Sequence, residues 1–278
     1  MGFKGWGKGK NSRKTSLNVY RHGGAHHLPP TTHFPSPPTH PPILAPHYCE
    51  LCQLPMSAHS SVQGVSSAST RWLCSACQVW LAPKPRCGCC GLVLCHAEAQ
   101  CGECLASPPA WSRLVCVGDY TPPLSHYVHK LKYERQFWQA DKLAELLAAR
   151  IGQETEMAPL LTSVPLHWRR WLYRGFNQSE QLALALARRL KVSYQPLFRR
   201  VRHSAAQQGL SKRERRRNLH GVFERRLDGV VADHVAIVDD VVTTGETVSQ
   251  LARLLLEVGV KRVDIYALCR TPEPDDES

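Results

Sequence analysis

One segment constrains the fold of this chain more than any other: VAIVDDVVTTGETV, residues 235–248. Four apolar residues precede two adjacent aspartates, and two further apolar residues lead into a threonine-rich turn with one glycine. The apolar run is typical of a buried parallel strand, and the residues after Gly245 are typical of a helix start. The segment therefore predicts a strand, a turn and a helix of an α/β sheet.

The polar residues of this segment indicate a ligand. Asp239 and Asp240 are expected at the exit of the strand, where open α/β sheets bind their ligands. The turn Thr243–Thr247 gathers amides and hydroxyls at a helix N-terminus, which favours an anion, and Gly245 permits a close approach of the backbone. Carboxylates beside a phosphate cradle suit a ribose 5-phosphate, because they accept hydrogen bonds from the 2- and 3-hydroxyls. A Walker-type loop is excluded, since Gly-Lys-Ser/Thr is absent.

The surrounding sequence alternates strand-like and helix-like stretches, which predicts a parallel sheet flanked by helices. Asn177, followed by Glu180, is expected to cap one helix. Thr243, followed by Glu246, is expected to cap another, which Gly259 closes. Strands are expected near 114–118, 160–166, 194–198, 234–240 and 262–269, and helices near 141–151, 177–190 and 246–258.

Ten of the twelve cysteines lie between Cys49 and Cys104, in a stretch broken by prolines and serines that cannot fold on apolar burial alone. Eight of them form four C-x-x-C pairs. Two such pairs complete one closed tetrahedral site, so the pattern predicts two structural zinc ions without a catalytic role. The predicted ligands are Cys49, Cys52, Cys74, Cys77, Cys87, Cys90, Cys101 and Cys104.

The spacing leaves the partners of these pairs open. Neighbouring pairs can share an ion, but a crossed arrangement that joins the Cys49 pair to the Cys87 pair is also possible. Cys89 and Cys95 are extra thiols that could replace a regular ligand. A metal-free set of reduced cysteines is the remaining alternative, and it leaves the segment without anything to fold around.

Charge and hydropathy limit the partners and the compartment. The 35 lysines and arginines exceed the 23 acidic residues by 12, which favours phosphate-bearing partners. No run approaches the roughly 20 apolar residues that a membrane span requires, and the N-terminus lacks the apolar core of a secretory signal. We therefore expect a cytoplasmic protein without a membrane span, whose clustered cysteines stay reduced.

At residues 235–248 the sequence resembles the type I phosphoribosyltransferases, whose signature for the diphosphate sugar PRPP it matches throughout. Residues 163–183 and 207–223, together with the four leading C-x-x-C pairs, resemble the ComF/GntX family. That family joins an N-terminal zinc module to a phosphoribosyltransferase domain and is associated with competence and the use of external DNA. The resemblance covers about residues 44–271.

The resemblance implies the roles of the site residues. Asp239 and Asp240 would contact the sugar and serve the catalytic site, and a pyrophosphate loop would span Pro165–Arg174. Magnesium and guanidinium groups would neutralise the departing pyrophosphate. The alternative interpretation of Arg169, Arg170 and Arg174 is a basic loop that is solvated at the surface. The implied 5-phosphate contacts are Thr243, Thr244, Gly245, Glu246 through its amide, and Thr247, and the implied anion ligands are Arg169, Arg170 and Arg174.

The expected organisation has four parts. They are a disordered Gly-, His- and Pro-rich tail (1–46), a double zinc module (47–108), a phosphoribosyltransferase-like domain (109–271) and an acidic tail (272–278). The basic run 199–217 has three interpretations. It is a flap that closes over pyrophosphate, a patch for DNA or RNA phosphates, or a solvated helix face.

Three functions fit these motifs. The first is an enzyme that binds PRPP with magnesium and transfers the phosphoribosyl group to an acceptor that the sequence does not identify. Too little chain follows Arg270 for a base-selecting hood, so we expect the zinc module to supply one or the hood to be absent. The second is a non-catalytic sensor of PRPP or a nucleotide, or an accessory of DNA-processing proteins. The third is a binder of nucleic acid, single-stranded DNA included, with a vestigial transferase domain.

Overall fold

The strands expected from the sequence form a parallel sheet in the computed structural model, which describes residues 47–56, 72–133, 138–153, 156–166, 172, 175–201, 222–226 and 232–272. These residues all belong to one compact unit, Pro46–Ser278. The predicted tail over 1–46 lies outside the described residues, as does the acidic tail apart from Pro272. The predicted boundary between residues 108 and 109 stays a prediction.

The sheet has five strands in the order β3-β9-β8-β4-β5, and every neighbouring pair is parallel. The predicted α/β fold class is therefore confirmed. β8 lies at the centre and is two residues longer than expected, whereas β5 is shorter. The strands are β3 (Arg113–Asp119), β4 (Leu160–Ser163), β5 (Ser193–Tyr194), β8 (His234–Val242) and β9 (Arg262–Arg270).

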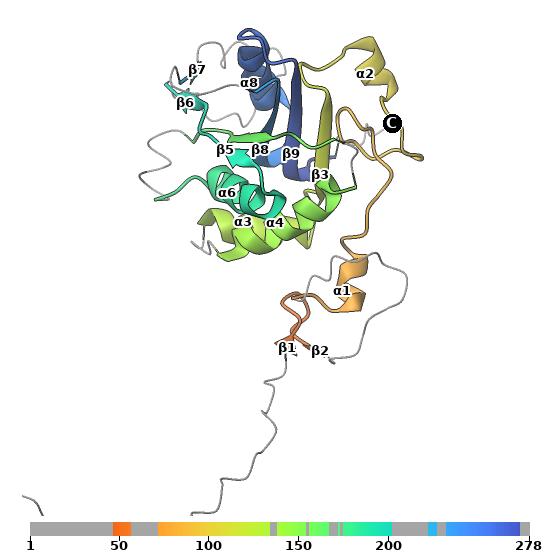
Figure 1. Ribbon diagram of the computed structural model, residues 1–278. Helices are drawn as coiled ribbons and strands as arrows, with labels where there is room; N and C mark the ends of the chain where they lie inside the picture. Colours follow the sequence, from red (N-terminus) through yellow and green to blue (C-terminus); the bar gives the residue numbers. More distant parts are fainter. Residues whose placement is uncertain are drawn as a thin grey trace, which may run out of the picture. The chain divides into compact units, whose positions relative to one another are not determined.

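Helices cover both faces of this sheet, as crossovers between parallel strands require (Figure 1). The side chain of Asn177 caps one of them by accepting a hydrogen bond from Ser179 N, as predicted. The first helix of the group, α3, was not expected. The helices are α3 (Leu124–Tyr133), α4 (Trp138–Ile151), α6 (Gln178–Leu190) and α8 (Glu246–Leu256).

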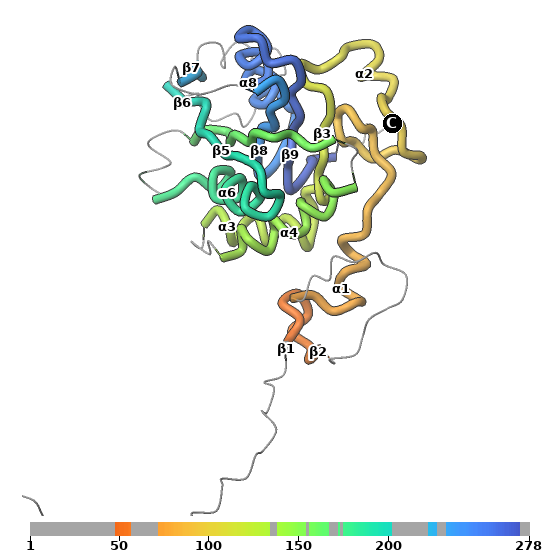
Figure 2. Tube along the Cα trace, in the orientation of Figure 1, coloured from red at the N-terminus to blue at the C-terminus, as the bar shows by residue number. Residues whose placement is uncertain are grey.

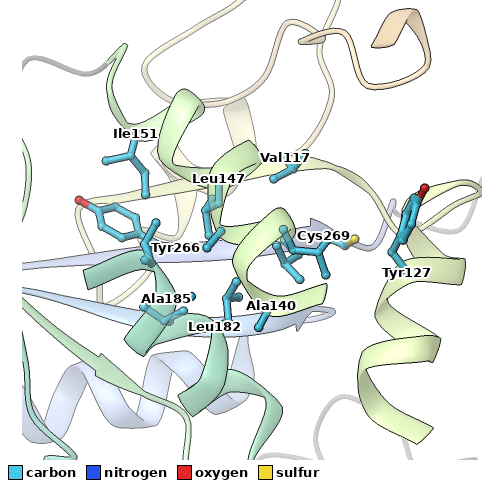
Figure 3. Close-up of a cluster of buried hydrophobic side chains, with 14 of the residues drawn as sticks. Val117, Tyr127, Ala140, Leu147, Ile151, Leu182, Ala185, Tyr266 and Cys269 are labelled. Carbon is cyan, nitrogen blue, oxygen red and sulfur yellow. The ribbon is translucent and has the colours of Figure 1, made fainter. Parts of the chain in front are cut away.

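The core has one layer on each side of the sheet, because successive side chains of a strand point to opposite faces. On β8, Ala236 and Val238 pack in the cluster that contains the buried residues of α3, α4 and α6. Val235 and Ile237 pack in a second cluster with the buried residues of α8. Figure 3 shows the first cluster, in which Leu147 and Leu182 lie over the sheet.

Short elements build the cysteine-rich part and a separate ribbon. β1 (His47–Tyr48) pairs with β2 (Pro55–Met56), and the helices α1 (Ser75–Val79) and α2 (Gly102–Ala106) have five residues each. β6 (Phe198–Arg200), at the start of the basic run, forms an antiparallel ribbon with β7 (Phe223–Arg225), which follows the run in the sequence. Residues 202–217 of that run lie outside the described residues. None of the described helices is long and apolar enough to cross a membrane.

Candidate functional site

The two aspartates lie near the carboxyl end of the central strand. Asp239 is in register with Ala267 of β9, and on the other side of β8 Ser163 of β4 is in register with Val238. Asp240 is buried with 4% exposure, whereas Asp239 is partly exposed. The pair therefore lies near the carboxyl ends of β8 and β9, just past the point where β4 ends, which is the usual ligand position of an α/β sheet.

Two donors hold the carboxylate of Asp239. Ser179 Oγ, in the first turn of α6, donates to Oδ1 at 2.9 Å, and the backbone amide of Asp240 donates to the same oxygen at 2.9 Å. Burial and then the charge of Asp240 outweigh these bonds and raise the pKa of Asp239 to about 7. Asp239 therefore gains or loses its proton near neutral pH.

A lysine on α3 pairs with the second aspartate. Lys132 Nζ lies 2.9 Å from Asp240 Oδ2. Burial acts to lower the pKa of Lys132, but the charge of Asp240 and the hydrogen bond to it prevail, so the pKa is raised and the lysine stays charged. Sequence reasoning missed both Lys132 and Ser179. The helical spacing of the buried Leu124, Tyr127, Val128 and Leu131 was the signal that could have located α3 and its lysine.

The phosphate loop predicted over residues 243–247 connects β8 directly to α8. The N-cap of α8 is Gly245, at φ 75° and ψ 1°, without a side-chain cap bond. The prediction that Thr243 caps this helix is therefore wrong, because the helix begins at Glu246 and its cap position requires the left-handed backbone that glycine adopts without strain. Thr243 and Thr244 are exposed beside the helix N-terminus, an arrangement suited to an anion.

A cavity of about 340 Å³ adjoins β4. Ser163 and Tyr194 line it, with their hydroxyl oxygens 3.0 Å apart. Pro165 and Leu166, the first residues of the predicted pyrophosphate loop, line it as well. Three arginines also contribute to the wall: Arg199, Arg200 and Arg226. The predicted anion ligands Arg169, Arg170 and Arg174 lie outside the described residues.

The cysteines predicted as zinc ligands gather into two clusters, within each of which the sulfur atoms lie within 4.8 Å of one another. Neighbouring pairs share a cluster, so the crossed arrangement does not occur, and neither Cys89 nor Cys95 belongs to either group. The first cluster is Cys49, Cys52, Cys74 and Cys77, and the second cluster is Cys87, Cys90, Cys101 and Cys104.

The sulfur spacing fits a metal. Tetrahedral zinc with Zn–S bonds of roughly 2.3 Å separates its sulfurs by about 3.8 Å, whereas a disulfide brings them to about 2.05 Å. The Sγ–Sγ distance is 3.8 Å between Cys52 and Cys74 in the first cluster. In the second cluster it is 3.9 Å between Cys87 and Cys104 and 3.7 Å between Cys90 and Cys101. Both clusters therefore could hold a zinc ion.

Backbone amides prepare one sulfur of the second cluster for a metal. The amides of Cys90 and Cys101 donate to Cys87 Sγ at 3.5 and 3.2 Å. Burial opposes ionisation, but these bonds outweigh it and lower the pKa of Cys87 to about 7. The thiolate is the form that binds a metal, so the fold favours the ligand state at this position.

Comparison with known proteins agrees with this architecture. The family model of the phosphoribosyl transferase domain matches residues 177–278. DNA utilization protein YhgH of Salmonella typhimurium is 42% identical over 236 residues, which cover 82% of this chain and 99% of the relative. Competence protein F of Haemophilus influenzae is 37% identical over 207 residues, which cover 71% of this chain and 90% of the relative.

Among solved structures, a hypoxanthine phosphoribosyltransferase from Staphylococcus aureus matches with 17% identity and a TM-score of 0.33 over 51% of this chain and 70% of its own. The identity to YhgH and competence protein F extends over nearly the whole of each relative. The chain therefore belongs to the ComF/GntX family of proteins with a phosphoribosyl transferase domain.

Proposed function

We propose that this protein binds PRPP, or a related ribose 5-phosphate, together with magnesium at the carboxyl end of β8. The observation that supports the proposal is the position of Asp239 and Asp240 near the end of β8, separated by two residues from the turn that carries the exposed Thr243 and Thr244 and leads to the N-terminus of α8. Carboxylates alone would repel a phosphate. Beside such a turn, the two carboxylates suit a ligand that carries both vicinal hydroxyls and a phosphate group.

In this proposal the two acids accept hydrogen bonds from the 2- and 3-hydroxyls of the ribose. Thr243, Thr244 and Thr247 and the amides of Gly245 and Glu246 hold the 5-phosphate, because a helix N-terminus offers unpaired N–H groups and a favourable dipole. Lys132 pairs with Asp240 and orients its carboxylate before the sugar arrives.

The pyrophosphate of PRPP is proposed to lie toward the cavity beside β4. Its lining includes Arg199 and Arg200, and the segment that follows Leu166 carries the predicted ligands Arg169, Arg170 and Arg174. Bound magnesium would add positive charge on the pyrophosphate oxygens. Guanidinium groups suit the same oxygens because their planar forks bind phosphate in a bidentate manner.

The proposed reaction is a phosphoribosyl transfer. A nucleophile attacks the anomeric carbon, the bond from that carbon to the pyrophosphate oxygen breaks, and pyrophosphate leaves with the bonding electrons. Positive charge that surrounds the departing oxygens stabilises this transition state. The alternative is a non-catalytic protein that senses PRPP or a nucleotide at the same site.

The relatives extend the proposal to DNA. Their names assign one to DNA utilization and another to competence, so we propose that this protein serves the use of external DNA. Single-stranded DNA or DNA-processing proteins are the proposed partners, through the basic run 199–217. The cytoplasm is the proposed compartment, and zinc is the proposed ion of both cysteine clusters, since reduced thiols are maintained there.

Calorimetric titration of the zinc-loaded protein with PRPP and magnesium tests the site. Wild-type protein is expected to bind, and the double variant Asp239→Asn, Asp240→Asn is expected to lose binding at least 100-fold because two sugar contacts are removed. Asp233→Asn is the matched control, since Asp233 precedes the opposite end of β8 and is exposed. Binding that survives in the double variant would contradict the site, and absence of binding in the wild type would overturn the function.

Two further measurements separate the candidate functions. Release of pyrophosphate on addition of a nucleobase or another nucleophile supports the enzyme, whereas binding without release supports the sensor. A nucleic-acid binder with a vestigial transferase domain would instead keep its DNA affinity in the double aspartate variant. Its affinity would fall steeply with salt, because binding releases counterions from the phosphates.

A further inference from the structure

The second cysteine cluster turns backbone carbonyl groups toward the sheet. Three consecutive carbonyls of its first C-x-x-C turn accept hydrogen bonds from residues in β3, in β9 and just before β3. Figure 2 shows the segment between α1 and α2, which contains this turn, passing beside β3. In such a turn the metal holds the two flanking sulfurs, so the direction of the carbonyls depends on the cluster. The bonds are Leu114 N to Gly88 O at 2.9 Å, Trp111 Nε1 to Cys89 O at 2.8 Å and Arg270 Nε to Cys90 O at 3.0 Å.

Arg270 extends from this turn to the phosphate loop. Its Nε donates to Cys90 O at 3.0 Å, and its Nη1 donates to the carbonyl of Thr243, the first residue of the loop. Nη1 also lies 2.9 Å from Thr271 O. The side chain is buried with 8% exposure, so these contacts are shielded from water. One guanidinium thus joins a cluster cysteine to the start of the loop.

Trp111 makes a second connection, at the other end of the turn. Its indole N–H donates to Cys89 O at 2.8 Å. Its ring lies against Gly245, where a Cβ atom would be only 2.7 Å from Cη2. The tryptophan therefore supports Gly245, the left-handed N-cap of α8, and its own position depends on the cysteine turn.

The first cluster packs elsewhere and offers a comparison. Cys49 and Cys77 belong to the core cluster that contains the buried residues of α3 and α4. Beside them Trp72 packs edge to face on Tyr127, with ring centroids 5.6 Å apart. Loss of a metal there is expected to disturb those helices and to leave the turn after β8 in place.

We propose that the second cysteine cluster, through Arg270 and Trp111, holds the phosphate loop in its binding conformation, so that zinc at this cluster controls the affinity for a sugar phosphate. The proposal rests on the proposed function of the loop. Thr243 begins the loop and Gly245 is the N-cap of α8, so the positions of these two residues determine whether the amides of Gly245 and Glu246 converge on one phosphate. Arg270 and Trp111 are positioning residues, and a loop ordered in advance binds more tightly because less entropy is lost on binding.

Hydrogen exchange in the zinc-loaded, full-length protein tests this coupling without any sugar phosphate. Arg270→Met is expected to speed exchange of the amides of residues 244–248 about tenfold, which is the effect of one net hydrogen bond. Cys101→Ser, which removes a ligand from the second cluster, is expected to speed exchange of the same amides. The double variant is expected to exchange no faster than the faster single variant, because both changes break one chain of contacts.

Three control variants complete the experiment. Cys52→Ser removes a ligand from the first cluster and is expected to leave exchange in the loop unchanged. Arg270→Lys keeps one charged donor group, so its loop amides are expected to exchange at a rate between those of wild type and Arg270→Met. Trp111→Phe removes the indole N–H while all eight cluster cysteines remain, so it tests the second connection even where Cys101→Ser fails to fold.

Unchanged loop exchange in both Arg270→Met and Trp111→Phe would overturn the proposal. It would also be overturned if the double variant Arg270→Met, Cys101→Ser increased the exchange rate by the product of the two single increases. Titration with PRPP separates this outcome from failure of the proposed function. If wild type and Arg270→Met bind PRPP with equal affinity and show equal loop exchange, the proposed coupling is contradicted, but the proposed PRPP binding is not. Absence of PRPP binding in wild type, with faster loop exchange in Arg270→Met, contradicts the function and leaves the coupling intact.

Discussion

Lys132 on α3 lies 2.9 Å from Asp240 on β8, so the second aspartate of the site has a cationic partner within the protein itself. Its neighbour Asp239 accepts hydrogen bonds from two uncharged donors, Ser179 Oγ and the amide of Asp240. The two adjacent carboxylates therefore differ in character. Asp240 is a paired, buried charge, and Asp239 is a group whose charge depends on pH near neutrality.

Lys132→Met is expected to lower the free energy of unfolding by about 2 kcal/mol, because it leaves Asp240 as a buried charge without its partner. Urea unfolding followed by circular dichroism measures this loss. Lys261→Met is the control, since Lys261 and Asp233 form an exposed pair, and its unfolding midpoint should match that of the wild type. Wild-type stability in Lys132→Met would contradict a buried pair, and adding Asp240→Asn should recover part of the loss.

Asp239→Asn is expected to stabilise the protein in a pH-dependent manner. Because burial raises the pKa of Asp239 from 3.8 to about 7, the folded state holds this proton more tightly than the unfolded state. Its contribution to stability is full below pH 3.8 and is lost as pH rises through 7. The variant should therefore exceed wild type by about 1–3 kcal/mol at pH 8, with a smaller difference at pH 5.

Urea unfolding at the two pH values measures this difference. Asp233→Asn is the control, since its exposed carboxylate should change little between them. An equal difference at pH 5 and pH 8 would show that Asp239 does not titrate in this range. The gain in stability should accompany a loss of PRPP binding, as is common where a site keeps a strained group for function.

Gly245→Ala is expected to weaken both the fold and ligand binding. Alanine at φ 75° is strained, and its Cβ would meet Trp111 at 2.7 Å, so we expect a loss of about 2 kcal/mol in the free energy of unfolding. Thermal unfolding and PRPP titration report the two effects. Gly102→Ala is the matched control, because its added Cβ would meet no atom within 4 Å beyond its chain neighbours and its own helix backbone. A stable Gly245→Ala would contradict the close packing.

Metal analysis is expected to find two zinc ions per chain, one for each cluster. Cys52→Ser and Cys101→Ser should each reduce the content by about one ion, since each removes a ligand from a different cluster. Fewer than about 1.5 ions in the wild type would argue against two sites of this kind. Chelation should also lower the thermal stability, because ion binding contributes directly to the folding of small cysteine modules.

Local patterns predicted most of the fold. The strand at residues 234–242 and the helix after Gly245 follow from a short apolar run and the turn behind it, and the Asn177 cap follows from its place before a helix. The Thr243 cap was wrong because the backbone at Gly245, and not the nearest hydroxyl, decides where α8 begins. Helix α3 was missed although its apolar residues repeat with helical spacing.

By itself, the sequence determined the α/β sheet, the aspartate pair before the threonine turn and the four C-x-x-C pairs, because each depends on residues that are close together in the chain. Only the tertiary structure decided which pairs share a cluster, that Lys132 compensates Asp240, and that Arg270 joins Cys90 to Thr243. Identical spacings cannot distinguish one partner from another. Contacts between distant residues depend instead on how the helices and the cysteine turns pack against the sheet.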